Sequence, residues 1–446
     1  MNNKITSNIA LIVVLAIIAV LVIFPILPNL PSNSSERELI KALISAPNID
    51  LASIFMKDNL NLTDNLYIYF TRLILNFFPN ANLVLILRLP GAIIITFLTV
   101  CLFNFDGSSE KLNASFLASL LFLTCGLTIE FTFHATPLIF PAAAFIFALM
   151  SLYHWLHHLN RRYFSLLVGS CAISTILIGV IAPFILLLIG CVFIASSKRY
   201  SVKSYLAVIS SLALGVIIAF LAIYMLLGDK NATMQIFRIE PQFISIFESN
   251  SAIVFLQYLI FAIFPWSVPL IISCYSFARN PHTTWDEFIK LTLLERFGLV
   301  IFILSIPTLF FVTPISVVFV ITTMFFNMPL IGKYLLTQFN HHPYVWRITG
   351  MICAIIVSSA AIIFIFLKSI ACIIIYNYAF SITPGWSFWQ IFVLIWIFGG
   401  LYSLWRNKRD IGSNNRYLYN IITIYLAAII LYTGYIDGHL SVAYIA

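Results

Sequence analysis

The chain has very few charged residues for its length. Only 9% of its 446 residues are Asp, Glu, Lys or Arg, whereas 61% are hydrophobic, and the mean hydropathy is +1.02. A soluble globule of this size needs far more charge to cover its surface, so the composition excludes a soluble protein. The period-two alternation of a membrane barrel strand is also missing, which argues against an outer-membrane barrel.

Cysteine is scarce and shows no pattern. The seven cysteines all fall inside apolar runs, and none belongs to a C-x-x-C pair. An odd number without paired spacing predicts neither a disulfide framework nor a metal site, so we interpret them as small buried hydrophobic residues. The chain also lacks low-complexity tracts and any stretch that resembles a soluble domain.

Long apolar runs are what the sequence does contain. Runs of about 17 to 25 residues recur along the whole length, and each is long enough to cross a bilayer as a helix. We therefore predict an all-α polytopic integral membrane protein, a single domain over residues 1–446 with about thirteen transmembrane helices. The predicted spans are 9–27, 83–104, 114–130, 137–155, 163–180, 182–197, 204–228, 251–275, 297–312, 314–331, 348–367, 389–405 and 418–436.

The first apolar run and two prolines refine this set of spans. The first run lacks a small-x-small cleavage site, so we interpret it as a retained signal anchor. Pro183 and Pro314 each lie between two apolar runs, where a proline marks either a tight turn or a kink within one helix.

The basic residues predict the orientation in the membrane. In a soluble protein the net charge of +8 would suggest a nucleic-acid partner, whereas here we expect none, because Lys and Arg gather on the cytoplasmic side of membrane proteins. With the N-terminus inside, 16 of the 24 basic residues lie in cytoplasmic segments. We therefore expect a multi-pass protein of the cell inner membrane with a cytoplasmic N-terminus and a periplasmic C-terminus.

This topology gives two long periplasmic loops, at residues 28–82 and 229–250. In the first, Ser35 and Glu38 have the spacing of a capping box, and apolar residues follow at helical spacing. This pattern predicts an amphipathic helix on the membrane surface. Residues 65–78 form a second apolar piece that carries Arg72, and this piece fits an interfacial or re-entrant helix better than a crossing one.

Four short motifs follow one another along the chain. They are Ser-Glu-Arg-Glu at 35–38, Leu-Tyr-Ile-Tyr at 66–69, Arg-Leu-Pro-Gly-Ala at 88–92 and Phe-Pro-Trp-Ser at 264–267. Their order resembles the GT-C superfamily of glycosyltransferases, particularly bacterial protein mannosyltransferases and the lipid A aminoarabinose transferase. The resemblance implies a membrane enzyme that moves a hexosyl or pentosyl group from a polyprenyl phosphate, such as undecaprenyl phosphate, to a lipid or glycan acceptor on the periplasmic face.

The chain departs from that family pattern in three places. Relatives pair an Asp with a Glu in the first external loop, whereas this chain has Ser35 beside Glu36. A second Asp expected before the fourth span is replaced by Thr136, with Glu130 and His134 nearby. We also expect no soluble C-terminal domain of the kind that some relatives carry. A divergent, catalytically inactive relative is therefore an alternative interpretation.

The resemblance assigns roles to the outer carboxylates. Glycosyl transfer needs a carboxylate that deprotonates or orients the acceptor, and cationic or metal help for the phosphate. Glu36 is the first candidate for the catalytic carboxylate and Glu38 the second. The alternative is that Glu38 only caps its helix and Glu36 only complements the helix N-terminus.

Arg88 and Lys368 are the candidates for binding donor phosphate. Arg88 lies inside a predicted span, where it either binds phosphate through its forked guanidinium or extends to the membrane interface. Glu130 and His134 stand at i and i+4 and supply either a second acid, a ligand for a divalent metal, or merely polar groups at the interface. The sequence leaves the need for a metal open.

A non-enzymatic flippase for a lipid-linked glycan is the main rival function. Such a carrier needs a polar path through the bilayer, and the middles of nearly all predicted spans lack ionisable residues. That scarcity favours the enzyme. In either case the partners are a polyprenyl-linked sugar and membrane lipids.

Overall fold

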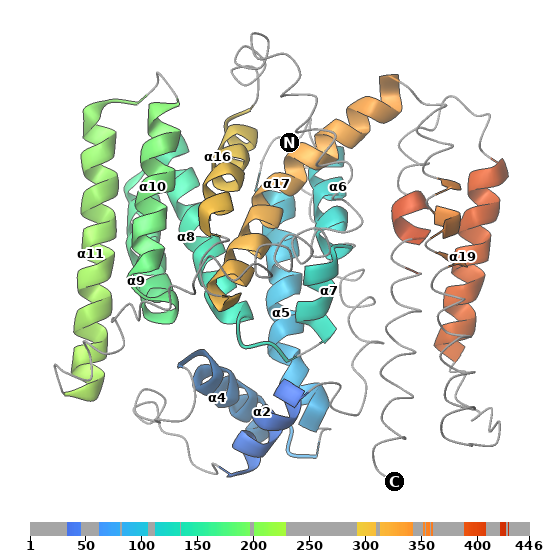
Figure 1. Cartoon of the computed structure of the whole chain (residues 1–446), viewed down its shortest axis with the longest axis horizontal. Coiled ribbons are helices and arrows are strands. Elements are labelled where there is room, and N and C mark those ends of the chain that lie inside the picture. Colours follow the sequence, from blue (N-terminus) through green and yellow to red (C-terminus); the bar gives the residue numbers. More distant parts are fainter. Residues whose placement is uncertain are drawn as a thin grey trace, which may run out of the picture. The chain divides into compact units, whose positions relative to one another are not determined.

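The computed structural model describes helices throughout the interpretable part of the chain, and no strand occurs there (Figure 1). The described residues are 34–45, 62–80, 83–105, 112–133, 135–196, 200–228, 292–308, 313–341 and 388–406, with short pieces at 351–359 and 420–427. The predicted spans 9–27, 251–275, 348–367 and 418–436 lie wholly or mostly outside these residues. The total of about thirteen therefore stays a prediction.

The chain divides into two compact units. One comprises Met1–Ile40, Phe77–Ala135 and Ile331–Ala446, and the other comprises Lys41–Asn76 and Thr136–Leu330. The prediction of a single membrane domain is not tested by this division.

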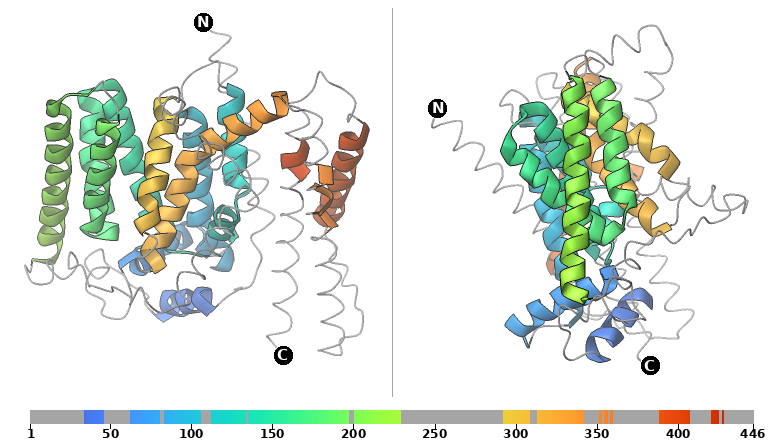
Figure 2. Two further views of the ribbon diagram at one scale, coloured as in Figure 1. Left: turned by 45° about the horizontal axis from the view of Figure 1, so that its top comes forward. Right: turned by 90° about the vertical axis from the view of Figure 1, so that its left-hand side faces the viewer.

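The second unit is built around four consecutive helices, α8 (Ile139–His158), α9 (Arg161–Ile178), α10 (Ile181–Ala195) and α11 (Val202–Leu227). Figures 1 and 2 show α9, α10 and α11 side by side, and α8 packs along α9. Because the connections are short, successive helices run antiparallel. Gly179, with φ of 90°, makes the turn between α9 and α10, so the proline at 183 follows a turn and does not kink one long helix.

Small residues set the distance between α9 and α11. A Cβ atom on Gly215 would lie 2.9 Å from Cβ and Sγ of Cys171, so only glycine permits this approach. Both helices begin at the same end of the unit and pack in parallel. This common start brings their first residues to one membrane surface.

Two further helices complete the core of this unit. They are α16 (Leu293–Thr308) and α17 (Thr313–His341), which has Pro314 in its first turn. The Phe297 ring lies 5.4 Å from that of Tyr153 and 5.0 Å from that of Phe193. Asn327 Nδ2 donates to the Gly298 carbonyl at 3.0 Å, which ties α17 to α16.

The helix α4 (Leu62–Phe77) packs against the beginning of α8. The Phe140 ring lies 5.6 Å from that of Tyr67 and 5.1 Å from that of Phe70. The predicted apolar helix at 65–78 is thereby confirmed as a helix. Because Arg161 follows the end of α8, α4 and the α8–α9 turn lie at opposite ends of the same bundle.

The first unit contains α5 (Leu83–Asn104), α6 (Leu112–Leu123), α7 (Gly126–Phe133) and α19 (Phe388–Arg406). The bounds of α5 coincide with the predicted span 83–104, and α19 lies within one residue of the span 389–405. The single span predicted at 114–130 is wrong, because the helix breaks at Thr124. The Thr124 hydroxyl donates to the carbonyls of Leu120 and Leu121 at 3.0 and 2.9 Å and closes the end of α6.

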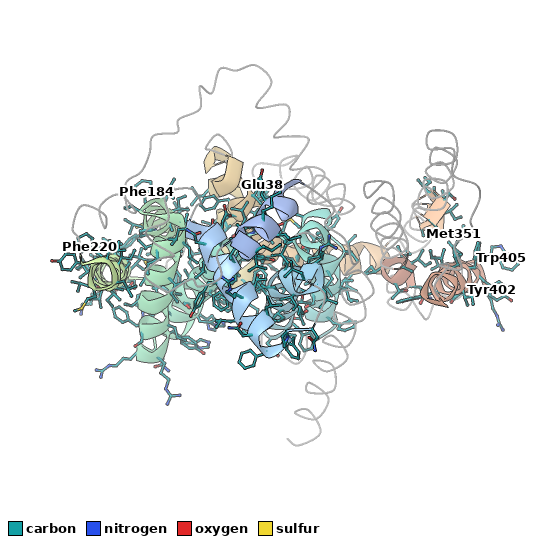
Figure 3. The ribbon with its side chains drawn as sticks, turned by 90° about the horizontal axis from the view of Figure 1, so that it is seen from below. Glu38, Phe184, Phe220, Met351, Tyr402 and Trp405 are labelled. Atoms are coloured by element: carbon teal, nitrogen blue, oxygen red, sulfur yellow. The ribbon has the colours of Figure 1, made fainter. Side chains whose placement is uncertain are left out.

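Five helices are long and apolar enough to cross a membrane, judged by length and composition in the described residues. They are Leu83–Asn104, Ile139–His158, Arg161–Ile178, Val202–Leu227 and the Val317–Leu336 part of α17. The span predicted at 182–197 is a shorter apolar helix of 15 residues. Large apolar side chains such as Phe184, which is 64% exposed, project outward from it, as expected where a helix faces lipid (Figure 3).

Candidate active site

The two candidate catalytic carboxylates lie in the first turns of one short helix, α2 (Ser34–Ser45). It begins one residue before the predicted cap at Ser35, within the usual scatter of helix ends. Glu38 is exposed and is labelled on this helix in Figure 3. The structure describes the backbone of Glu36 but not its side chain. A carboxylate in this position is favoured by the positive end of the helix dipole.

The predicted amphipathic character of α2 is confirmed in part. Leu39 and Leu43 are buried, as expected for the apolar stripe, whereas Ile44 is 68% exposed. The stripe is therefore narrower than the sequence pattern indicates. It fixes one face of α2 and leaves Glu38 free to meet a partner from outside.

Arg72 of α4 holds the far end of α2. Its Nη2 atom donates to the Leu43 carbonyl at 3.2 Å. Leu43 is among the last residues of α2, whose carbonyls have no partner within the helix. A guanidinium there satisfies the carbonyl and meets the negative end of the dipole. Sequence reasoning noted Arg72 only as a charge in an apolar helix and missed this role.

Arg88 lies in α5 and is completely buried, with 0% of its surface exposed. Its guanidinium is therefore covered by protein, and both predicted roles, phosphate binding and extension to the membrane interface, stay predictions. Among the described residues, Arg88 and Glu295 are the buried charged side chains. Pro90, two positions later in the same helix, lacks an N–H and leaves the carbonyl of Ile86 without its helical donor.

A glycine in the same motif brings α5 against α7. A Cβ atom on Gly91 would lie 2.5 Å from the Phe131 carbonyl oxygen, a distance that no other residue tolerates without movement. Gly91 follows Arg88 by less than one turn, and Phe131 follows Glu130 directly. The structure thus places the backbones of Arg88 and Glu130 on adjoining turns of two touching helices. The Glu130 side chain, His134 and Lys368 lie outside the described residues.

Glu295, the other buried charge, has a structural role. Its carboxylate accepts a hydrogen bond from the Thr292 backbone N–H at 2.8 Å, and its own N–H donates to the Thr292 hydroxyl at 3.4 Å. This reciprocal pair is a capping box at the start of α16. In the part of the chain that the structure describes, no three His, Cys, Asp or Glu residues form a group that could hold a metal ion.

Comparison with solved structures identifies the architecture. The crystal structure of ArnT from Cupriavidus metallidurans in the apo state superposes with a TM-score of 0.62 at 14% identity, over 96% of this chain and 77% of that one. The chain has the ArnT fold. The crystal structure of ArnT bound to undecaprenyl phosphate matches with a TM-score of 0.57 at 13% identity, over 96% of this chain and 78% of that one.

No family model and no curated protein matches the sequence. At 13 to 14% identity the ArnT likeness shows the fold alone. At that level it agrees with the fold that the resemblance implied. It also confirms the prediction of an all-helical polytopic membrane protein.

Proposed function

We propose that this chain is a membrane glycosyltransferase that takes a sugar from a polyprenyl-phosphate carrier and transfers it to a lipid or glycan acceptor on the periplasmic face. Residues 28–82 and 229–250 would be its two periplasmic loops. The observation that carries the proposal is the ArnT fold over 96% of the chain, since ArnT itself has been solved with undecaprenyl phosphate bound. The scarcity of buried charge in the described helices supports an enzyme over a carrier.

The proposed reaction is a displacement at the anomeric carbon. An acceptor hydroxyl gives its proton to the Glu36 carboxylate, and its oxygen forms a bond to the anomeric carbon. The bond from that carbon to the phosphate oxygen breaks with its electron pair, which leaves polyprenyl phosphate and inverts the configuration of the sugar. Glu38 is the second candidate for the base, and it stands less than one turn further along α2.

The leaving phosphate needs positive charge. Lys368 is the proposed direct contact, and Arg88 contributes the charge of a guanidinium held in α5. Because Arg88 is fully covered, direct contact with phosphate would require α5 or a neighbour to move. Glu130 and His134 are proposed as a second acid or as part of a divalent metal site. Carboxylate oxygen and imidazole nitrogen are suitable ligands for such an ion.

A transfer assay in defined membranes tests the proposal. The full chain is reconstituted into nanodiscs with undecaprenyl-phosphate sugars and extracted bacterial lipids, and mass spectrometry follows both products. The expected result is an added sugar mass on an acceptor together with free undecaprenyl phosphate. Movement of the lipid-linked sugar between leaflets without any transfer product would favour the flippase instead.

A binding measurement separates an inactive relative from a wrong assignment. Undecaprenyl phosphate is titrated into the nanodiscs, and the midpoint of thermal unfolding is recorded. A ligand that binds only the folded protein raises this midpoint, and the rise grows with the logarithm of its concentration above the Kd. Binding without transfer for every sugar tried would identify a divergent relative that keeps the lipid site but lacks the chemistry. Neither binding nor transfer would reject the function.

A further inference from the structure

In the described residues, α8 to α11 carry exposed cations and no acid at the end of the bundle that lies opposite α4. Arg161 and Arg162 begin α9, Lys203 begins α11, and all three are exposed. No Asp or Glu occurs in the sequence between Glu130 and Asp229. The charges of α8 through α11 at this end are therefore all positive.

The packing of α9 against α11 places these cations at the same height along the bundle axis. Arg161 precedes Cys171 by about 15 Å of helix and Lys203 precedes Gly215 by about 18 Å, at 1.5 Å per residue. Cys171 and Gly215 touch each other. Because α9 and α11 run parallel, their first turns reach the same membrane surface.

A carboxylate of the described helices at this end, that of Glu295, is buried in a helix cap. Glu295 starts α16 at this same end, as the contacts of Phe297 with Tyr153 and Phe193 show. Its side chain is only 5% exposed and is engaged by the Thr292 N–H. Its negative charge is thus directed into the helix cap and away from the surface.

The turn between α8 and α9 is held by stacked rings. The Tyr163 ring lies 5.2 Å from that of His154 and 5.5 Å from that of His158, with interplanar angles of 20° and 23°. His157 Nδ1 and His158 Nε2 share a hydrogen bond of 3.2 Å. The Asn160 side chain accepts from the Arg162 N–H at 3.2 Å. The two arginines therefore project from a fixed turn.

Leu159 at the tip of this turn is strained and exposed. Its φ of 52° lies in the left-handed region, which favours glycine, and 58% of its side chain is accessible. Holding a leucine there costs about 1 kcal/mol or more, and its backbone N–H caps α8 by donating to the Trp155 carbonyl at 2.7 Å. Since α8 and α9 are both long and apolar enough to cross a membrane, the turn that carries Leu159 would meet the membrane surface.

We propose that this surface, formed by Leu159, Arg161, Arg162 and Lys203, binds the headgroups of anionic phospholipids. The arginines contact lipid phosphate through their forked N–H donors, and Leu159 inserts between the acyl chains beside it. A soluble anion would satisfy the cations but would make no contact with the leucine. This combination favours a lipid as the occupant. The proposal is independent of glycosyl transfer.

The experiment compares lipid affinity across matched variants of the full chain. Protein in detergent is titrated with phosphatidylglycerol, and native mass spectrometry counts the bound lipids. Each arginine contributes about a 5-fold gain in affinity near an anionic lipid, so Arg161→Gln with Arg162→Gln weakens binding by about 25-fold. Leu159→Gly relieves the strain, so the protein unfolds at an unchanged or higher temperature while phosphatidylglycerol binding falls.

Lys41→Gln is the matched control, because Lys41 is an exposed cation on α2 and lies outside the proposed surface. It should leave the number of bound phosphatidylglycerol molecules unchanged. Equal losses in Lys41→Gln and in the arginine variants would reject a defined site in favour of general charge attraction. Inorganic phosphate that stabilises the protein as strongly as phosphatidylglycerol would reject the lipid as the occupant.

Discussion

The two ends of the α8–α11 bundle use their arginines in opposite ways. At the α4 end, Arg72 is directed inward and donates to a helix carbonyl, so its charge serves a neighbouring helix. At the other end, Arg161 and Arg162 are exposed, and the capping bond to Asn160 uses the backbone N–H of Arg162. An arginine that stabilises the fold directs its guanidinium toward a neighbouring helix, whereas one that can bind an outside partner directs it toward the surface. Composition alone does not distinguish the two.

The difference extends to the carboxylates. The helix α2, which Arg72 holds, places Glu36 and Glu38 at its free end, whereas Glu295 at the opposite end is buried in a capping box. Among the described side chains, Glu38 is therefore exposed at one end and Glu295 is buried at the other. The comparison predicts that a substitution at the α4 end can abolish glycosyl transfer without affecting phosphatidylglycerol binding at the opposite end of the bundle.

The largest expected effect is that of Glu36→Gln. Loss of a catalytic carboxylate lowers transfer by about 100-fold or more, and the amide keeps the size of the side chain. The transfer assay measures this rate at equal protein abundance. Glu38→Gln is the matched control on the same helix and should cost far less. If Glu36→Gln keeps full activity while Glu38→Gln loses it, the base is Glu38.

Arg72→Gln tests whether the inward arginine acts by positioning. Without the guanidinium the end of α2 shifts, and transfer falls by about tenfold because catalytic groups tolerate little misplacement. Arg72→Lys, which keeps a donor and a charge, should recover part of kcat. Both variants should bind phosphatidylglycerol like the unchanged chain. A fall in protein abundance that fully accounts for the lost activity would reduce Arg72 to a structural role.

Gly91→Ala tests the contact between α5 and α7. The new Cβ would meet the Phe131 carbonyl oxygen at 2.5 Å, so the helices must separate, at a cost of about 1 to 2 kcal/mol of stability. Thermal unfolding in detergent measures the change. Gly169→Ala is the control, since a Cβ there meets nothing within 4 Å. It should be neutral or stabilising by up to about 1 kcal/mol.

Thr292→Ala is expected to have the smallest effect. It removes one half of the capping box at the start of α16 and costs about 1 kcal/mol. Thermal unfolding again provides the readout. The substitution should leave phosphatidylglycerol binding unchanged, because the variant keeps the backbone N–H that donates to the Glu295 carboxylate. Unchanged lipid affinity together with lower stability would show that Glu295 stays directed away from the surface.

Sequence patterns predicted those helix bounds that depend on the spacing of neighbouring residues. The bounds of α5 follow from one uninterrupted apolar run, and the start of α2 follows from the Ser35 to Glu38 spacing. The break between α6 and α7 was missed because apolar residues continue across it, and Gly126, the first residue of α7, was the signal that could have marked it.

The features that the sequence did not predict depend on contacts between residues far apart in the chain. Arg72 and Leu43 are 29 positions apart, and no pattern in the sequence links a cation to one particular carbonyl. The burial of Arg88 depends in the same way on what surrounds it. The motif Arg-Leu-Pro-Gly-Ala marked the right segment of the chain, yet the closeness of Gly91 to Phe131 could be found only in three dimensions.

The contact of Gly91 with the Phe131 carbonyl has a mechanical consequence. Where side chains separate two helices, they can repack and let the helices slide, but here one backbone rests directly on another. The helical turn that carries Arg88 and the turn that carries Glu130 are therefore in direct backbone contact and are expected to move together. Any motion of α5 that uncovers Arg88 would carry the backbone of Glu130 with it, so the two groups would be presented to a ligand together or not at all.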